Sequence, residues 1–569
     1  MTHDYLIIGA GPAGLQLAAL LERDGHDYRV LEAGPAPGTF FTTYPRHRQL
    51  ISINKVYTGS DDPEFNLRTD WNSLLSDDPA LLFARYTERY FPDAEVLLRY
   101  LADFAAATGV RVVPRTTVVR VSRDGDGFRA LDADGRTWRG RRLVVATGVS
   151  KLHVPPIEGI ETAERYDTVS VDPRDFVNQR VMVIGKGNSG FETADALVET
   201  AAVVHVAGPH SVRFAWQTHY VGHLRAVNNN FLDTYQLKSQ NAVLDGTVES
   251  IHRRPGGGYL VRFRYARSVE AIREIEYDRV IACTGFRFDA SIFDDTCRPR
   301  LVIDDRFPEQ TPAYESTSVP DLYFAGTLTQ QRDFKRSTSG FIHGFRYGAR
   351  ALHRILNSRY HGVAWPSTEL PATPEAITDA IIARINRSSG LWQQFGVLGD
   401  VVTVRGGTAR YHEEVPVAYL ADGGLGDESA LAVTLEYGAG HDAVDPFDVS
   451  VPRVAENDAQ GAHRATYLHP VVRHRRGGTV MAVHHLAENL ENQWNLPTVH
   501  QQPLAAFVKE CLAGAERWAE LPAGRARPPR HRPGPAGVRA RPAYRRRRRA
   551  GGPGRPDQRR AASGGDRSG

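Results

Sequence analysis

Two glycine-rich turns constrain the fold of this chain more than any other feature of its sequence. "DYLIIGAGPAGLQLAALLERDGHDYRVLEAG" and "RVMVIGKGNSGFETADALVETAAVVHVAG" both read as strand, turn, helix and strand. In such a unit the first glycine permits the tight turn, the second lets the backbone approach a pyrophosphate, and the third lets the helix pack on the strand. Because each turn follows an apolar run and opens a helix, whose N-terminus attracts anions, the sequence predicts two Rossmann-like dinucleotide-binding units. The turn residues are Gly9, Gly11 and Gly14 in the first unit and Gly185, Gly187, Asn188, Ser189 and Gly190 in the second.

The two units end differently, and the difference predicts two cofactors. Glu32 follows the second strand of the first unit, where a carboxylate accepts hydrogen bonds from an adenosine ribose 2′-hydroxyl, as in FAD or NAD sites. The equivalent position of the second unit is Gly208, and Arg213 lies in the loop that follows. A missing carboxylate with a nearby arginine suits a 2′-phosphate and hence NADPH, although Arg213 can also be an ordinary surface charge. We expect FAD in the first unit and NADPH in the second, with reducing equivalents passing from nicotinamide to flavin.

The order of the motifs predicts that the second unit is inserted into the first. A β-patterned run around Asp-Gly turns returns to "LVVATG" before the second unit begins, and "YDRVIACTGF" closes that unit. The expected fold class is α/β, with two Rossmann-like domains, the second inserted in the first, and a mixed α+β C-terminal region. The predicted parts are an FAD-binding domain at 1–150 and 277–360, an NADPH-binding domain at 151–276, the C-terminal region at 361–520 and an Arg/Pro/Gly-rich tail at 521–569.

The composition of the chain indicates where in the cell the protein is located and which partners it has. Its apolar runs are shorter than the ~18–20 residues that a membrane span needs, and a strand begins directly at the N-terminus, which leaves no room for a secretory signal. We therefore expect a cytoplasmic protein with neither a membrane nor a nucleic acid as partner. Residues 523–569 carry fifteen arginines against two aspartates. This tail is either a nucleic-acid-binding arm or, as we prefer, a disordered segment such as the product of an out-of-frame reading.

The number and spacing of the cysteines exclude several kinds of site. Cys283, Cys297 and Cys511 lie far apart, and no CxxC pair occurs. This arrangement excludes a disulfide framework, a cysteine-rich zinc site and the dithiol pair on which disulfide reductases depend. No metal site is predicted.

Several motifs resemble a known family. "GAGPAG", "VVATG", "GKGNSG", "ACTGF" and "LYFAG" are similar, in order and spacing, to those of the two-dinucleotide flavoproteins that include flavin-containing monooxygenases. Longer blocks such as "FFTTYPRHRQLISINK" and "RSTSGFIHGFRYGARALHRIL" resemble a subfamily over residues 1 to about 515. One branch of it is an endoplasmic-reticulum flavoprotein linked to degradation of misfolded proteins, and the other is a set of bacterial biosynthetic N-monooxygenases. Because the sequence has neither a signal peptide nor a KDEL-like ending, we favour the bacterial branch.

The resemblance implies an FAD- and NADPH-dependent monooxygenase. Such an enzyme forms a C4a-hydroperoxyflavin from O2 and oxygenates the amine nitrogen of a small molecule, here expected to be an amino acid such as aspartate. Neither position 162 nor position 163 carries the histidine of the monooxygenase fingerprint, so Baeyer–Villiger chemistry is unsupported. The alternatives are an NADPH oxidase or electron-transfer flavoprotein without oxygen insertion, and a non-catalytic flavoprotein scaffold. The sequence leaves a homodimer open.

The segment "TYPRHRQLISINK", directly after the first unit, supplies candidate reactive residues. In flavin-containing monooxygenases an asparagine beside the flavin steadies the hydroperoxide, and the resemblance gives that role to Asn54. Arg46 and Lys55 are candidate catalytic cations, and Arg48 is a candidate for the cofactor phosphates, because arginine binds carboxylates and phosphates bidentately and lysine binds them as a point charge. Each of these cations can instead be a solvated loop residue.

Further candidates come from the later motifs. The resemblance implies that "VVATG" and "LYFAGT" lie against FAD, which adds Thr147, Gly148, Gly326 and Thr327 to the cofactor-binding residues. A carboxylate-bearing substrate also needs charge partners, and the loop after "LYFAGT" offers Arg332, Lys335 and Arg336.

Overall fold

A computed structural model of the chain describes residues 1–267, 271–405, 407–426 and 429–519. Met1–Arg517 form one compact unit. The tail predicted at 521–569 lies outside the described residues. Within the described ranges, no helix combines the length and the apolar character that a membrane crossing requires.

The first sheet carries the first glycine turn. Its strand order is β3-β2-β1-β6-β5-β4, and β18 also pairs with β6. The pairs β1–β2, β1–β6, β2–β3 and β18–β6 are parallel, whereas β4, β5 and β6 form the antiparallel meander expected from the Asp-Gly turns. The strands are β1 (Thr2–Ile8), β2 (Tyr28–Leu31), β3 (Val112–Val113), β4 (Val118–Asp124), β5 (Gly127–Asp132), β6 (Thr137–Val145) and β18 (Leu322–Phe324).

Helices cover this sheet because its central strand is apolar on both faces. Tyr5, Leu6 and Ile7 of β1 are all fully buried, which is typical of a parallel strand between two layers. Tyr5 and Ile7 share a core cluster with residues of the helices α1 (Pro12–Arg23), α4 (Ala94–Thr108) and α8 (Ile342–His361). The helix α4 ends at Gly109, whose φ of 67° suits glycine.

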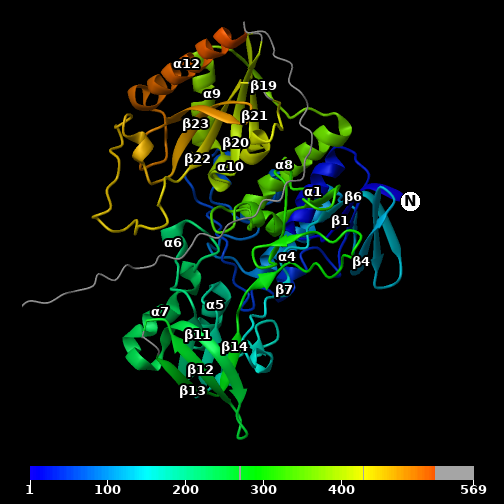
Figure 1. Cartoon of the computed structure of the whole chain (residues 1–569), viewed down its shortest axis with the longest axis vertical. Helices are drawn as coiled ribbons and strands as arrows, with labels where there is room; N and C mark the ends of the chain where they lie inside the picture. The colour runs from blue at the N-terminus through cyan, green and yellow to red at the C-terminus, as the bar shows by residue number, and fades with distance from the viewer. Residues whose placement is uncertain (268–270, 406, 427–428, 520–569) are drawn as a thin grey trace, which may run out of the picture. The chain divides into compact units, whose positions relative to one another are not determined.

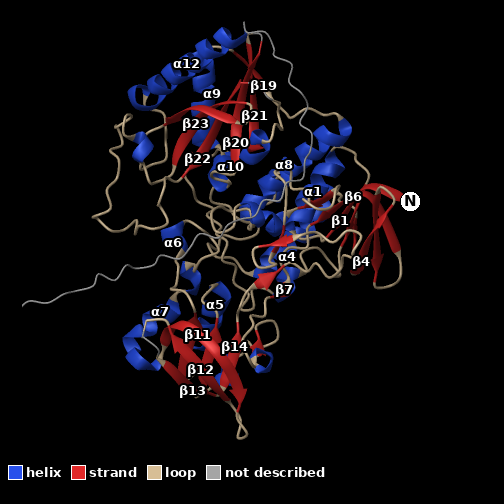
Figure 2. Ribbon diagram, viewed as in Figure 1, coloured by secondary structure: helices blue, strands red, loops and turns tan. Residues whose placement is uncertain are grey.

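The second sheet carries the second glycine turn. Its order is β13-β12-β11-β10-β9-β14-β8, and α5 (Asn188–Leu197) connects β9 to β10. The strands β8 to β11 and β14 pair in parallel, and β12 and β13 add an antiparallel edge. Figure 2 shows β11 to β14 within this sheet. The strands are β8 (Glu164–Arg165), β9 (Arg180–Ile184), β10 (Val203–Gly208), β11 (Ala242–Arg253), β12 (Tyr259–Tyr265), β13 (Ile272–Tyr277) and β14 (Arg279–Ala282).

A third sheet forms the C-terminal layer and is wholly antiparallel, in the order β19-β21-β20-β22-β23-β24. Its alternating side chains face two cores: Val402 and Leu431 pack with α9 and α12, while Val401 and Ala432 join the core of the first sheet. Figure 1 shows α9 and the orange α12 beside the yellow strands. The elements are β19 (Thr368–Pro371), α9 (Pro374–Arg387), β20 (Leu398–Arg405), β21 (Thr408–Pro416), β22 (Ser429–Glu436), β23 (His469–Arg476), β24 (Thr479–His485) and α12 (Gln502–Ala519).

Short elements connect these layers. Two small antiparallel pairs join β7 to β15 and β16 to β17. The short elements are α2 (Phe40–Thr43), α3 (Pro63–Asn66), β7 (Lys151–Leu152), α6 (Ala215–Thr218), α7 (Asn230–Asp233), β15 (Phe286–Arg287), β16 (Leu301–Val302), β17 (Phe307–Pro308), α10 (Ser389–Gln393) and α11 (Val417–Ala421).

The architecture confirms the predicted fold class. Two Rossmann-like units are present, and the second interrupts the first, because β18 returns to the first sheet only after β14 has completed the second. The C-terminal layer is the mixed α+β region expected after the second unit. The individual domain boundaries stay a prediction.

Candidate functional site

One cavity of about 1480 Å³ brings both glycine turns together. Gly11 borders it from the first turn, and Gly185 and Gly187 border it from the second. The loop residues Thr147, Gly148, Gly326 and Thr327, predicted to lie against FAD, line it as well, as do Asn188, Ser189 and Arg213. Residues predicted for two different nucleotides therefore line one cavity.

The first turn has the steric pattern of a pyrophosphate cradle. A Cβ on Gly14 would lie 2.0 Å from the carbonyl oxygen of Gly9, and a Cβ on Gly9 would lie 2.8 Å from that of Ala146. At Gly11, the residue before α1, a Cβ would meet no described heavy atom within 4 Å. The first and third glycines thus serve close packing, and the second leaves open space at a helix N-terminus, where a phosphate binds.

The second turn repeats the same pattern. A Cβ on Gly185 would lie 2.1 Å from the carbonyl oxygen of Cys283, and one on Gly190 would lie 2.1 Å from that of Gly185. Gly187 precedes α5 and again has no described heavy atom within 4 Å of an added Cβ. Both turns therefore fit the anionic bridge of a dinucleotide.

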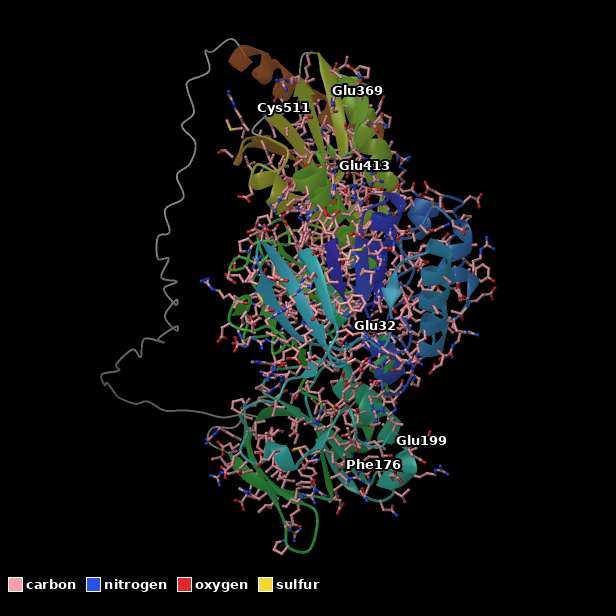
Figure 3. All side chains as sticks on the ribbon, turned by 90° about the vertical axis from the view of Figure 1, so that its right-hand side faces the viewer. Glu32, Phe176, Glu199, Glu369, Glu413 and Cys511 are labelled. Carbon is pink, nitrogen blue, oxygen red and sulfur yellow. The ribbon has the colours of Figure 1, made fainter. Side chains whose placement is uncertain are left out.

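Glu32 lies at the edge of the first turn, at the end of β2. Its Oε2 accepts a hydrogen bond from the backbone N–H of Ala10 at 2.7 Å, and its Oε1 accepts one from that of Gly34 at 2.9 Å. Figure 3 labels this side chain on the first unit. The carboxylate is buried, with 6% of the residue exposed, and is not among the residues that border the cavity. Each oxygen keeps a second lone pair, so a ribose contact stays a prediction.

Positive side chains gather where the second unit lacks a carboxylate. The stem of Lys186 would lie 3.3 Å from a Cβ on Gly208, and its ammonium pairs with Asp245. Arg213, Arg306 and Lys335 line the same cavity. Burial, followed by the charges of Arg306 and Arg213, lowers the pKa of Lys335 below its ordinary value. These cations suit an anion, and the ion pair of Arg213 within the described part of the chain is a long one, 3.8 Å, with the exposed Asp442.

Asn188 has a role that its motif did not reveal. Its Nδ2 donates to the carbonyl oxygen of His223 at 2.8 Å, and its Oδ1 accepts from the backbone N–H of Arg225 at 3.0 Å and from Asn228 Nδ2 at 3.2 Å. The second glycine turn is therefore tied to the loop at 222–228. Because the side chain is occupied by these bonds, the predicted contact with a cofactor stays a prediction.

The candidates of the 46–55 segment lie outside the cavity wall, although Leu50, Ile51 and Ser52 of the same segment line it. Arg46 Nη2 donates to the carbonyl oxygen of Val169 at 2.6 Å. Arg48 Nε pairs with Glu95 at 2.7 Å. Asn54 is 1% exposed and donates to the carbonyl oxygen of Thr87 at 2.7 Å, and the exposed Lys55 does not border the cavity. The structure brings none of the four together around the cavity, so their reactive roles stay predictions.

Aromatic side chains that the sequence did not single out form another part of the wall. His343, in the first turn of α8, stacks on Trp71 with ring centroids 4.2 Å apart and an interplanar angle of 23°. Phe341 lies parallel to the same imidazole at 5.9 Å. His343 belongs to the "SGFIHGF" block, but helical spacing alone gives no reason to place it in a site. Trp71 comes from a loop far away in the sequence.

The cysteines confirm the prediction that the chain offers no pair of thiols for disulfide exchange. All three lie within the described residues, and all are free and buried. Cys283 borders the cavity, and burial raises the pKa of its thiol to about 12, so it is not a thiolate at neutral pH. Cys511 lies on α12 of the C-terminal layer, where Figure 3 labels it apart from Glu32.

Comparison with known proteins places this site in a family. The pyridine nucleotide-disulphide oxidoreductase family matches residues 6–326. The chain is 40% identical over 565 residues to FAD-dependent oxidoreductase domain-containing protein 2 of Mus musculus, covering 90% of this chain and 84% of the relative. It is 31% identical over 231 residues to flavin-containing monooxygenase FMO GS-OX-like 9 of Arabidopsis thaliana, covering 35% of this chain and 49% of the relative.

Among solved structures, a flavin-containing monooxygenase from Stenotrophomonas maltophilia matches 63% of this chain and 98% of its own, with 22% identity and a TM-score of 0.49. The family match and the mouse relative confirm the resemblance to two-dinucleotide flavoproteins. The chain belongs to the pyridine nucleotide-disulphide oxidoreductase family, as an FAD-dependent oxidoreductase.

Proposed function

We propose that the protein is an FAD- and NADPH-dependent monooxygenase that oxygenates the amine nitrogen of a small molecule, an amino acid such as aspartate, in a biosynthetic pathway. One observation carries the proposal: a single cavity is bordered by both glycine turns and contains no dithiol to which electrons could pass. A dithiol is therefore not the electron acceptor in this proposal, which assigns that role to O2. The similarity to a plant flavin-containing monooxygenase supports the same chemistry.

The residues present fit both cofactors. Gly9, Gly11, Gly14 and Glu32 would hold the adenosine and pyrophosphate of FAD, and the loops at 147–148 and 326–327 would lie along its flavin end. Gly185, Gly187, Ser189 and Gly190 would hold the second pyrophosphate. Bound FAD would supply oxygen activation after its reduction. The protein's own task is to position the substrate and keep water away from the reacting atoms.

NADPH is preferred to NADH in this proposal because of the charges at its adenosine end. Arg213, Arg306 and Lys335 border the cavity there, and each can donate hydrogen bonds to a 2′-phosphate. Asp245 is the carboxylate nearest to Gly208 along the sheet, but Lys186 and Arg267 both pair with it. Among the described residues beside Gly208, no carboxylate is therefore free to accept a hydrogen bond from the ribose hydroxyl of NADH.

The wall of the cavity suits oxygen transfer. Phe286 packs edge to face against both Phe40 and Tyr44, with ring centroids 5.1 Å apart for Tyr44 and Phe286, so this part of the wall is apolar. Oxygenation uses the lone pair of the amine, so the amine must be unprotonated when it reacts. Burial, and next the charges of Arg346 and Arg225, hold the pKa of His343 well below its ordinary value. A neutral imidazole in the wall can accept a hydrogen bond from the amine.

The test is NADPH consumption by the purified protein against a panel of amines and amino acids, with aspartate first. Products are identified by mass spectrometry, and hydrogen peroxide is measured in parallel. The proposal expects one substrate to accelerate NADPH oxidation and to gain oxygen with little peroxide. NADPH oxidation that yields peroxide alone for every amine would instead support an oxidase, and a lack of any turnover would support a scaffold.

A further inference from the structure

A half-buried arginine, Arg225, lies behind the aromatic wall of the cavity, against Trp71, and does not itself border the cavity. Arg225 places its Cζ 4.9 Å from the centroid of the Trp71 ring. Its Nη1 is buried and has no hydrogen-bond partner, and no carboxylate in the described parts of the chain forms an ion pair with it. Burial lowers the pKa of this guanidinium from its ordinary value. Taking a charge out of water is unfavourable unless an anion or several acceptors compensate it.

Several other buried or half-buried arginines of this chain are compensated, whereas Arg225, like Arg142, has only aromatic rings against its guanidinium among the described residues. Arg384 is 3% exposed and pairs with Asp400 at 3.1 Å and with Glu414 at 3.4 Å. Arg350 pairs with the same Glu414 at 2.6 Å. Arg346 has no carboxylate, but it donates to the carbonyl oxygens of Asp70 and Ser73 at 3.0 and 2.8 Å. Arg225 has neither kind of partner among the described residues, so we expect a partner that comes from outside the chain.

His343 presents a second unpartnered group at the same place. The residue is 1% exposed and borders the cavity, and neither ring nitrogen has a hydrogen-bond partner among the described residues. Its ring stacks on Trp71, the side chain that Arg225 also contacts. A buried imidazole normally satisfies at least one of its nitrogens. Two unsatisfied groups around one indole indicate a site built for a polar ligand.

The three side chains are held in place by the surrounding fold. Trp71 Nε1 donates to the carbonyl oxygen of Arg68 at 3.2 Å, which fixes the indole. The backbone of Arg225 is fixed by Asn188 of the second glycine turn at 3.0 Å. His343 is part of α8. Because loop, glycine turn and helix each fix one member, the site is preorganised, and less ordering is needed when a ligand binds.

We propose that Arg225, Trp71 and His343 form the recognition site for a small amine that carries a carboxylate. The guanidinium of Arg225 pairs with the carboxylate, Trp71 packs against the carbon skeleton, and His343 accepts a hydrogen bond from the amine. This inference rests on the proposed amine oxygenation. Arginine suits the task because its planar fork matches the two oxygens of a carboxylate. Arg46 and Arg48 suit it less, because carbonyl oxygens and Glu95 already occupy them.

The test measures binding without turnover. Calorimetric titration of the purified holoprotein uses two probes, L-aspartate and propylamine, which both carry an amine but only one of which has carboxylates. We expect Arg225→Gln to raise the Kd of L-aspartate at least tenfold and to leave propylamine binding unchanged. Arg225→Lys, which keeps the charge but loses the fork, should give an intermediate Kd. Arg174→Gln is the matched control, because its side chain is 83% exposed and pairs only with Asp172 and so should leave both Kd values unchanged.

Bound flavin and the melting temperature identify any variant that fails to fold. If Arg225→Gln fails to fold, the test is the Kd of L-aspartate for Arg225→Lys compared with that for the wild type. Wild-type affinity for L-aspartate in Arg225→Gln or Arg225→Lys would overturn the inference, as would wild-type protein that binds propylamine as tightly as L-aspartate. The two proposals fail separately. Arg225-dependent binding without an oxygenated product would leave the site standing and refute the proposed function. Normal oxygenation of aspartate by Arg225→Gln, at the wild-type KM, would support the proposed function and refute the recognition site.

Discussion

Replacing Gly187 by alanine tests the second dinucleotide site with little disturbance of the fold. The backbone there has φ −95° and ψ −176°, which any residue adopts, and an added Cβ would meet no described heavy atom within 4 Å. The change at the helix N-cap should cost about 0.5–1 kcal/mol of stability. The same Cβ would occupy the space in which the pyrophosphate approaches the turn. Loss of one charge-assisted hydrogen bond there, about 1.5–3 kcal/mol, raises the Kd of NADPH by about 10- to 150-fold.

The assay is a titration of oxidised protein with NADPH or NADP⁺, followed by the change in flavin absorbance, together with the flavin content of each preparation. Gly256→Ala is the matched control, because an added Cβ there also meets nothing described within 4 Å and the residue does not border the cavity. Flavin content should stay at the wild-type level in both variants. A Gly187→Ala protein that binds NADPH within twofold of wild type would refute the assignment of this turn to the pyridine nucleotide.

Three further predictions concern charge, packing and pH. Arg213→Ala should raise the Kd of NADPH about tenfold and leave that of NADH unchanged, since only the former has a 2′-phosphate; an equal change for both would contradict the assignment. Gly14→Ala should yield protein with little bound flavin and a lowered melting temperature, because its Cβ would lie 2.0 Å from the carbonyl oxygen of Gly9 and overpacking costs about 1–3 kcal/mol; normal flavin content would count against this packing. Burial raises the pKa of Asp333 from 3.8 to about 6, so the folded protein binds more protons than the unfolded chain between these values. The stability contributed by Asp333 is therefore present at pH 4 and is lost as the pH rises through about 6, by about 2–3 kcal/mol. Asp333→Asn should remove this part of the pH dependence of unfolding, and an unchanged dependence would contradict it.

The glycine turns could be predicted from sequence because their causes are local. The apolar run before Gly9, the three glycines and the following helix lie within a few residues of one another, and each glycine has its own steric reason. The helix α4 ends at Gly109 for the same kind of local reason, because Gly109 adopts a positive φ. The missing carboxylate at Gly208 was also visible, because its place is fixed by counting from the turn.

The direction of single side chains could not be predicted in this way. Arg48 and Asn54 lie in a segment that borders the cavity, yet Glu95 and the carbonyl oxygen of Thr87 hold them elsewhere. Spacing along a loop does not define which residues face inward, since a loop has no regular period. Trp71 and Arg225 meet only through the tertiary fold, so no local pattern could have joined them.

The C-terminal layer was the least predictable part. The sequence predicted a mixed α+β region here, but the order β19-β21-β20-β22-β23-β24 depends on contacts between distant segments. Its motifs carry no known chemistry, and its side chains contribute to the core beneath α8 and to a core of their own.

The fate of molecular oxygen tests the central claim most directly. Purified protein is supplied with NADPH, L-aspartate and isotopically labelled O2, and the product is analysed by mass spectrometry while peroxide is measured. We predict an N-oxygenated amino acid that carries the label, with NADPH consumed in proportion to the oxygen transferred. NADPH consumption that delivers the label only to hydrogen peroxide, with aspartate and the rest of the amine panel recovered unchanged, would contradict the account.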